Sequence, residues 1–404
     1  MEIRPILSAM LRNKTGPVLI ALQIAIALAI ITNAAFIIEQ RYEKMNRPTG
    51  MDEQNLIFAR SIGFGESYDQ LSTIREDMDT LEAMPGIVSV GFIDQIPLSG
   101  SGSNSSFSST PFTDEPDHVT SNGNYYQADH RAAEALGLTL FEGRWFNQEE
   151  IDYRPGQNVL SPSVVVTRAW ADEAFGEGVP AVGKPVYNSV GQSSRIVGVI
   201  GHMQGAWVGW DGLDRVLIFG GYVEPPMATY AIRVEPGQKD KLVPEIEAKL
   251  QEINRNRVVL TVRTLTDYMA RSYSTDSAMI GMLSGVSVLL VAVTALGIVG
   301  LAAFNVNQRR KQIGTRRALG ARRSDILRYF LVESMIIATL GILLGILLTF
   351  LMSWWLGTQF NLPQLDWRYL PPVVLGVLLI SQLAVFGPAR RASGISPALA
   401  TRSV

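Results

Sequence analysis

The chain of 404 residues contains no cysteine and only three histidines. The lack of cysteine excludes disulfide bonds, thiolate metal sites and a cysteine nucleophile. The histidines, His118, His130 and His202, lie far apart in the sequence and form no i, i+4 pair that would bind a metal from one helix face. Neither a G-x-S-x-G nor an H-E-x-x-H motif occurs. We interpret the histidines as surface residues and expect no catalytic or metal site in this chain.

A complete phosphate-binding loop is also missing. Residues 178–185 (GVPAVGKP) match the P-loop pattern except at the last position, which must be Ser or Thr because its hydroxyl binds magnesium. Here that position is Pro185, and Pro180 removes one backbone N–H from the expected phosphate cradle. We interpret this segment as a turn and expect no nucleotide site in it.

Charge is absent or rare in four long apolar stretches, and 47% of the chain is hydrophobic. A helix needs about 20 apolar residues to cross a hydrocarbon core of about 30 Å. The sequence predicts four transmembrane helices, at residues 18–38, 277–306, 329–355 and 370–387. The third contains Glu333, and the fourth is short and begins with Pro371 and Pro372. The first is an alternative candidate for a cleaved signal peptide, but it exceeds the apolar core of about 7–15 residues, and no A-x-A site follows.

The charges divide the chain into two classes of segment. Residues 39–276 carry 20 basic and 33 acidic side chains, whereas all other segments together carry 15 basic and 4 acidic ones. Arginine and lysine gather in residues 1–17, 307–328 and 388–404. These three segments are predicted to be cytoplasmic, because basic loops stay inside. Residues 39–276 and the short turn at 356–369 are then expected on the outer side.

The outer segment has the pattern of a split α+β domain. Two strand–helix–strand units lie at its ends and flank a central piece with two further predicted strands and a short helix. We predict one part from residues 39–98 and 215–276, with an insertion at 99–214. The insertion opens with a Ser- and Gly-rich stretch, 99–110, which we interpret as a flexible linker or loop. The predicted elements are strands 55–60, 87–93, 164–166, 195–200, 228–234 and 258–262, and helices 69–84, 169–175 and 239–253.

Small residues recur at a spacing of four in three of the predicted spans. They are Ala21, Ala25 and Ala29 in the first, Gly281 and Gly285 in the second, and Gly341 and Gly345 in the third. Small residues at this spacing allow helix backbones to approach closely within a membrane. Two interpretations remain open: packing within one subunit, or a dimer seam that involves the first two spans.

The basic segment 307–328 is the strongest candidate for a binding site. Its charge is explained by membrane topology and by attraction to anionic lipid, worth about 1 kcal/mol per basic residue. Membrane topology and lipid attraction do not explain why this segment also contains apolar and small residues. Ile313 and Arg316 lie at helical spacing, Gly320 is predicted to end the helix, and Ser324 to cap the next one. A short helix followed by a turn is a shape suited to docking on another protein.

The same segment resembles a known family. Residues 310–321 (RKQIGTRRALGA) resemble the R-x-x-E-I-G-x-x-x-A-L-G-A motif of MacB/FtsX-like ABC permeases, and 388–398 (PARRASGISPA) resemble their P-A-x-x-A-x-x-I-x-P-A ending. Residues 137–146 (GLTLFEGRWF) are similar to the G-I-x-L-x-x-G-R-x-F stretch of MacB-type periplasmic domains, and 175–200 contain the later F-G, V-G-K and V-G-V elements. The match covers the whole chain in one order.

The resemblance implies a type VII ABC transporter in the bacterial inner membrane. The fold class is then four transmembrane helices plus an α+β periplasmic domain with porter-like and inserted Sabre-like parts. Two permease subunits would transmit ATP hydrolysis inside to movement outside, which is termed mechanotransmission. The implied contacts of the ATPase subunit are Arg309, Arg310, Lys311, Gln312, Ile313, Gly314, Arg316, Arg317, Ala318, Leu319, Gly320 and Ala321. One departure from the family pattern is Gln312, where an acidic residue is usual.

The resemblance also implies the partners. In MacB itself an ATPase domain precedes the first span, whereas here only about 17 residues do, so we expect two copies of a separate ATPase subunit that hold ATP and magnesium. A second permease subunit completes a homodimer or a heterodimer. A membrane-fusion protein and a TolC-like outer-membrane duct follow by analogy only. We expect export of a periplasmic substrate, and no nucleic acid partner.

Other functions remain possible from the sequence. Within the family, a permease that extracts lipoproteins or regulates cell-wall hydrolases, like LolC/LolE or FtsX, is the alternative, and the long insertion favours export. A membrane receptor lacks support because no cytoplasmic output domain is seen. A membrane-anchored hydrolase lacks support because no catalytic residues are seen.

Overall fold

The computed structural model describes residues 14–66, 68–113, 120–151, 160–222, 227–360 and 363–394. The chain divides into a helical unit, Met1–Asn46 with Asp276–Val404, and an outer unit, Arg47–Thr275. Some predictions lie outside the described residues: those on the basic residues in 1–13 and 395–404, on His118 and on the end of the tail motif at 395–398.

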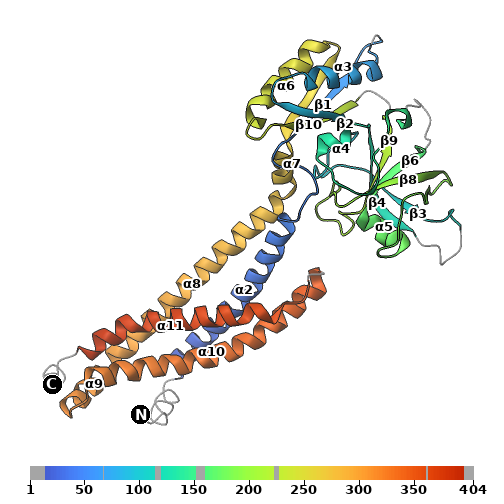
Figure 1. The fold of residues 1–404 in the computed structure, drawn as a ribbon. Helices are drawn as coiled ribbons and strands as arrows, with labels where there is room; N and C mark the ends of the chain where they lie inside the picture. The colour runs from blue at the N-terminus through green and yellow to red at the C-terminus, as the bar shows by residue number, and fades with distance from the viewer. Residues whose placement is uncertain are drawn as a thin grey trace. The chain divides into compact units, whose positions relative to one another are not determined.

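Four helices in the described part of the chain are long and apolar enough to cross a membrane. They are α2 (Thr15–Met45), α8 (Ser274–Gln308), α10 (Arg323–Phe360) and α11 (Leu370–Ser393), shown in Figure 1. Four apolar helices were predicted, and all are found. Each extends past its predicted apolar stretch, because a helix continues into polar residues beyond the hydrocarbon. In α11, proline lies in the first turn, where its missing N–H costs nothing.

The start of α10 differs from the prediction. Ser324 was expected to cap this helix, but α10 begins one residue earlier, at Arg323. The free backbone N–H of Arg322 donates to the Asp325 carboxylate at 2.9 Å instead. A carboxylate three residues into a helix can satisfy such an N–H and also complements the helix dipole. The prediction for Ser324 is therefore wrong.

Close packing in the helical unit centres on α2 and α10. A Cβ added to Gly341 would lie 2.8 Å from the carbonyl oxygen of Ala21, and one on Gly345 would lie 3.1 Å from Ala25. The Asn33 side chain donates to the carbonyl oxygens of Ala29 and Thr349, at 2.9 and 3.2 Å. The small residues of the first and third spans therefore face each other within one chain.

The outer unit contains a four-stranded antiparallel sheet in the order β11-β1-β10-β2. Helices α3 (Gln70–Glu82) and α6 (Lys239–Ile253) share a buried apolar cluster with it. The strands are β1 (Leu56–Gly63), β2 (Ile87–Phe92), β10 (Met227–Val234) and β11 (Arg257–Thr264). The two predicted strand–helix–strand units, from opposite ends of the segment, thus form one smaller sheet, and the prediction of these elements is confirmed.

The larger sheet has seven strands in the order β5-β8-β6-β9-β4-β3-β7, and β7 also pairs with β8. Six of its strands therefore form a closed ring, to which β5 is added. The strands are β3 (Asn104–Ser108), β4 (Ser121–Ala128), β5 (Leu140–Gly143), β6 (Ser163–Thr167), β7 (Pro185–Asn188), β8 (Ser193–Ile200) and β9 (Val216–Gly220). Helix α5 (Arg168–Phe175) packs beside these strands, whereas α4 (Ala132–Leu136) packs against β2 and β10 of the smaller sheet.

Two expectations about this region need correction. The stretch 99–110 is not a linker, because β3 lies in it and pairs with β4 and β7. Its Phe107 is buried against the apolar cluster of the larger sheet. The boundary expected at 214/215 is early, because β9 pairs with β4 and β6 of the larger sheet. Residues 178–185 do form a turn, with left-handed Gly178 and Gly183.

Candidate functional site

The short helix α9 (Arg310–Ala318) connects α8 to α10 at one end of the helical unit (Figure 1). It ends as predicted at Gly320, whose φ of 100° is accessible mainly to glycine. The Gly320 N–H bonds the Arg317 carbonyl at 3.2 Å, and the Ala321 N–H bonds the Arg316 carbonyl at 3.1 Å. This pair of bonds is a Schellman motif, which stops the helix and reverses the chain.

Apolar residues fix α9 from one side. Ile313 is 5% exposed and packs in the same apolar cluster as Phe330 of α10 and Ala389 of α11. Gly314 beside it is also buried. These two residues are among the predicted contacts of an ATPase subunit, and their side of α9 faces the interior of the helical unit. Their burial explains why a basic segment contains small and apolar residues.

Polar contacts hold α9 from the other sides. Arg309, in the break between α8 and α9, donates to the Tyr329 hydroxyl at 3.1 Å and to the Glu333 carboxylate at 3.0 Å. The Arg316 guanidinium lies 5.2 Å from the ring centre of Tyr329. Arg317 donates to the Ser393 carbonyl at the end of α11, at 3.1 Å. Helix α9 is therefore tied to both α10 and α11.

The remaining surface of α9 is open. Among the predicted contact residues, those with exposed side chains or backbone are Arg310, Lys311, Gln312, Arg316, Ala318, Leu319 and Gly320. Leu319 at the tip is 84% exposed, and the chain on either side of it carries Arg316, Arg317, Arg322 and Arg323. A small groove between α9 and α10 is lined by Arg309, Gln312, Arg316 and Tyr329. An exposed apolar residue in a segment rich in exposed cations suits an acidic protein surface with an apolar pocket.

A second ionic site joins the other ends of the helices. Asp276, at the start of α8, is 4% exposed and pairs with Arg41 and Lys44 from the last part of α2. The Lys44 ammonium lies 3.1 Å from its carboxylate. Sequence reasoning did not find this site. The available signal was an acidic residue directly before one apolar stretch and two cations just after another.

Helix α8 leaves most of its length uncovered by the described chain. A Cβ added at Gly281 or Gly285 would meet no atom of the described residues within 4 Å. Large apolar side chains nearby are more than half exposed: Met282, Val288, Leu289 and Leu296. Besides the ion pairs of Asp276, its contacts with α2 include Gln23, which donates to the Val293 carbonyl at 3.0 Å. The apolar face of α8 therefore faces lipid or another protein.

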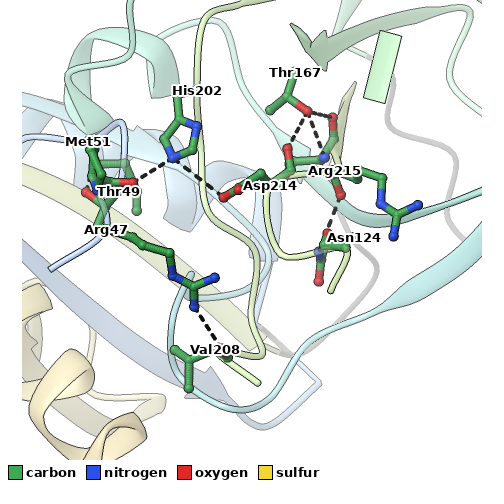
Figure 2. A network of polar contacts seen from close by, with 12 residues as sticks. Arg47, Thr49, Met51, Asn124, Thr167, His202, Val208, Asp214 and Arg215 are labelled. Atoms are coloured by element: carbon green, nitrogen blue, oxygen red, sulfur yellow. Dashed lines mark hydrogen bonds and ion pairs between the residues drawn. The ribbon is translucent and has the colours of Figure 1, made fainter. Parts of the chain in front are cut away.

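The start of the outer unit is held by a polar network, shown in Figure 2. Arg47 donates to the Val208 carbonyl at 3.0 Å, and His202 donates from Nε2 to the Pro48 carbonyl at 2.6 Å. Asp214 lies 3.5 Å from the same His202 nitrogen. His202 is therefore a structural residue as well as a partly exposed one. Within the described residues, no group of three or more His, Asp or Glu side chains is placed to hold a metal ion.

Two family models match the chain. The MacB-like periplasmic core domain matches residues 18–252, which is more than half of the chain, and the FtsX-like permease C-terminal domain matches residues 284–397. The chain belongs to the MacB/FtsX-like family of ABC transporter permeases. The resemblance drawn from the α9 and tail motifs is thereby confirmed. Four apolar helices and an α+β domain after the first of them agree with this family.

Individual relatives agree with the assignment. The macrolide export ATP-binding/permease protein MacB of Bdellovibrio bacteriovorus is 30% identical over 288 residues, which is 64% of this chain and 41% of that protein. MacB of Escherichia coli O157:H7 is 26% identical over 283 residues, 65% of this chain and 40% of that protein. This chain therefore spans less than half of these relatives. A solved extracellular domain of the ABC-type transporter YknZ from Gram-positive bacteria is similar over 50% of this chain and all of that one, with 13% identity and a TM-score of 0.32.

Proposed function

We propose that the chain is the permease subunit of an inner-membrane ABC exporter, and that a separate ATPase subunit docks on α9. The observation that carries the proposal is the two-sided character of α9. One side is anchored to α10 and α11 by Ile313 and Arg309, whereas Leu319 and cations such as Lys311 are exposed. A helix held in this way can receive a force and pass it to two spans.

The charge distribution supports the orientation. The basic residues of α9 and of the end of α11 belong on the cytoplasmic side, where ATP is available. The acid-rich outer unit then lies in the periplasm. Nucleotide binding by this chain has no support, because residues 178–185 run from α5 into β7 as a turn. A P-loop requires the opposite order, a strand followed by a helix.

The lengths of α2 and α8 support mechanical coupling. With 35 residues, α8 is about 50 Å long at about 1.5 Å per residue, well above the membrane core of about 30 Å. The buried Asp276 joins the far end of α8 to α2 through Arg41 and Lys44. We infer that α2 and α8 move as a pair and carry movement from α9 to the outer unit, which is the mechanotransmission expected for this family.

The uncovered face of α8 supports a second permease subunit. Ala21 and Ala25 already pack against Gly341 and Gly345 of α10. A Cβ added at Gly281 or Gly285, in contrast, would meet no described atom within 4 Å. We therefore place the seam between two permeases on α8 rather than equally on the first two spans. The partner is a second copy or a related permease.

The export direction is supported by the relatives, whose names describe macrolide export. The seven-stranded insertion is the second support, since it offers a periplasmic surface beyond the smaller sheet. In our proposal the smaller and larger sheets correspond to the porter-like and Sabre-like parts. A membrane-fusion protein and a TolC-like duct are then the expected route for the substrate. Lipoprotein extraction is the alternative within the family.

Affinity purification of the tagged chain from its host membranes tests the docking role. We expect an ABC-type ATPase to co-purify with the wild-type chain. The double variant Lys311→Glu/Leu319→Asp changes only exposed residues of α9, so it should lose the ATPase while membrane insertion and thermal stability persist. Arg328→Glu, an exposed charge reversal on α10, is the matched control and should retain it. Retention by the α9 variant, or no ATPase with the wild-type chain, would refute the proposal.

A further inference from the structure

The smaller and larger sheets of the outer unit are joined by a short backbone crossing. Ile93, just after β2, forms an isolated antiparallel bridge with Ala128 at the end of β4. On either side, the Asp94 N–H bonds the Gln127 carbonyl at 2.9 Å, and the Asp129 N–H bonds the Phe92 carbonyl at 3.2 Å. The crossing therefore connects the edge strand of one sheet to an inner strand of the other.

Two carboxylates reinforce this crossing reciprocally. Asp94 Oδ1 accepts the Gln127 N–H at 2.9 Å, and Asp129 Oδ1 accepts the Phe92 N–H at 3.0 Å. Each aspartate thus holds a backbone amide of the opposite strand. Asp129 is fully buried, and its Oδ2 has no hydrogen-bond partner among the described residues. Asp94 is partly buried and accepts a further bond from the Gln95 side chain at 3.1 Å.

Burial raises the pKa of Asp129 to about 7 and raises the pKa of the partly buried Asp94 as well, although the backbone N–H bonds that the two carboxylates accept lower both values in part. Few charges oppose this effect. Asp94 faces the hydroxyl of Tyr126 on β4, which is neutral at this pH. Asp129 faces Arg131, which lowers its pKa in part, and the imidazole of His130, whose Nδ1 lies 4.0 Å away. The hydroxyl of Tyr222 also faces Asp129, and Arg75 of α3 lies near that tyrosine.

The sign of the pH effect follows from linkage. A carboxyl with a raised pKa in the joined state binds its proton more tightly there than in an opened state, where its pKa is about 4. Protonation therefore favours the joined crossing. The free energy that favours the joined crossing over the opened one is largest below about pH 4. It decreases as the pH rises toward about 7 and changes little above that.

We propose that Asp94 and Asp129 form a proton-linked clasp that sets how tightly the smaller and larger sheets are joined. The clasp is firm in mild acid and loosens toward neutral pH. A shared apolar cluster, with Phe58 of one sheet and Val165 of the other, keeps the sheets together at either pH. The clasp therefore changes local opening at the crossing rather than separating the sheets. The inference is independent of the ATPase proposal, since it concerns the outer unit alone.

Amide hydrogen exchange of the full chain in lipid nanodiscs tests the clasp. We expect peptides that cover Phe92–Asp94 and Gln127–Asp129 to lose roughly 80-fold in protection between pH 5 and pH 8, after correction for intrinsic exchange, because one carboxyl whose pKa falls from about 7 to about 4 on opening changes the opening equilibrium by that factor. A peptide from β6 and the start of α5 serves as an internal reference and should not change. The isosteric variant Asp94→Asn/Asp129→Asn carries no titratable group there and should show flat protection.

Control variants separate the aspartates from the neighbouring histidine. His130→Gln should keep the full pH response, because the clasp does not use the imidazole. Protection at the crossing that is independent of pH in the wild-type chain would overturn the inference, whatever the variants do. Persistence of the response in the doubly substituted chain would overturn it as well, since another group would then carry it.

Discussion

Arg309 donates hydrogen bonds to the Glu333 carboxylate and to the Tyr329 hydroxyl, at 3.0 and 3.1 Å. This single side chain links the break between α8 and α9 to the next helix, α10. Glu333 is 4% exposed and is the one charge in the third predicted span. An ionisable residue at such a position is retained when it has a partner and a role. Here the pair fixes the start of α9 against α10.

Removal of either partner of the Arg309–Glu333 pair should therefore destabilise the packing of α9 against α10. We expect Arg309→Gln to lower the free energy of unfolding of the helical unit by up to about 3 kcal/mol, because Glu333 is left buried without its cation. Thermal unfolding of the purified chain in detergent measures this loss. ATPase co-purification should decrease in the same variant, since α9 loses its fixed position.

Arg310→Gln is the matched control for this pair. Arg310 is the neighbouring residue and is exposed, so its loss should change stability by less than about 0.5 kcal/mol. The double variant Arg309→Glu/Glu333→Arg should recover part of the stability lost by Arg309→Gln. Equal stability of the Arg309 and Arg310 variants would show that the ion pair has no structural role.

The helices of this protein were largely predictable because their patterns are local. Leu242, Ile246 and Leu250 repeat every four residues and form the buried face of α6, whose predicted bounds match the structure. The turn at Gly320 was also predictable, since a positive φ strongly favours glycine. The four spans follow from composition alone.

The remaining features depend on contacts that are distant in sequence. β3 was missed because its Ser-rich sequence resembles a linker, and only pairing with β4 and β7 makes it a strand. The burial of Ile313 follows from packing against α10 and α11, so a pattern in nine residues cannot reveal it. The Asp276 site needs α2 and α8 to be adjacent, which neither apolar stretch specifies.

Helix packing between α2 and α10 should be sensitive to small changes. Gly341→Ala would place a Cβ 2.8 Å from the Ala21 carbonyl oxygen, so one backbone must shift. We expect a loss of about 1–3 kcal/mol in stability, as for other overpacked interiors. Thermal unfolding measures it. Gly376→Ala on α11 has no described neighbour within 4 Å and should be nearly neutral. A neutral Gly341→Ala would contradict the close approach.

A buried ion pair should dominate the stability of the smaller sheet. Arg257 on β11 and Asp77 on α3 form a bidentate pair with both side chains fully buried, and Tyr230 donates to Asp77 at 2.5 Å. We expect Arg257→Met to destabilise the outer unit by about 3 kcal/mol or more, because the Asp77 carboxyl is left buried without its partner. Lys249→Met removes an exposed ion pair and should cost less than about 1 kcal/mol. Comparable losses in the two variants would contradict this ranking.

The seam between two permeases is tested by the glycines of α8. Gly285→Leu adds a bulky side chain where no described residue of the chain lies within 4 Å, so the fold of one subunit should tolerate it. If α8 packs against a second permease, the same side chain separates the two backbones and weakens their association. We expect the apparent dissociation constant in nanodiscs or detergent to rise at least about tenfold, equivalent to about 1.4 kcal/mol. Subunit exchange between differently tagged copies measures it.

Gly376→Leu on α11 is the control for this experiment. Its site is equally open in the described chain, so it adds the same apolar bulk to another lipid-accessible face. It should leave both association and unfolding unchanged. If Gly285→Leu and Gly376→Leu associate alike, then α8 faces lipid and the seam lies elsewhere. If Gly285→Leu instead lowers thermal stability at dilutions where only single subunits exist, then Gly285 packs within its own chain.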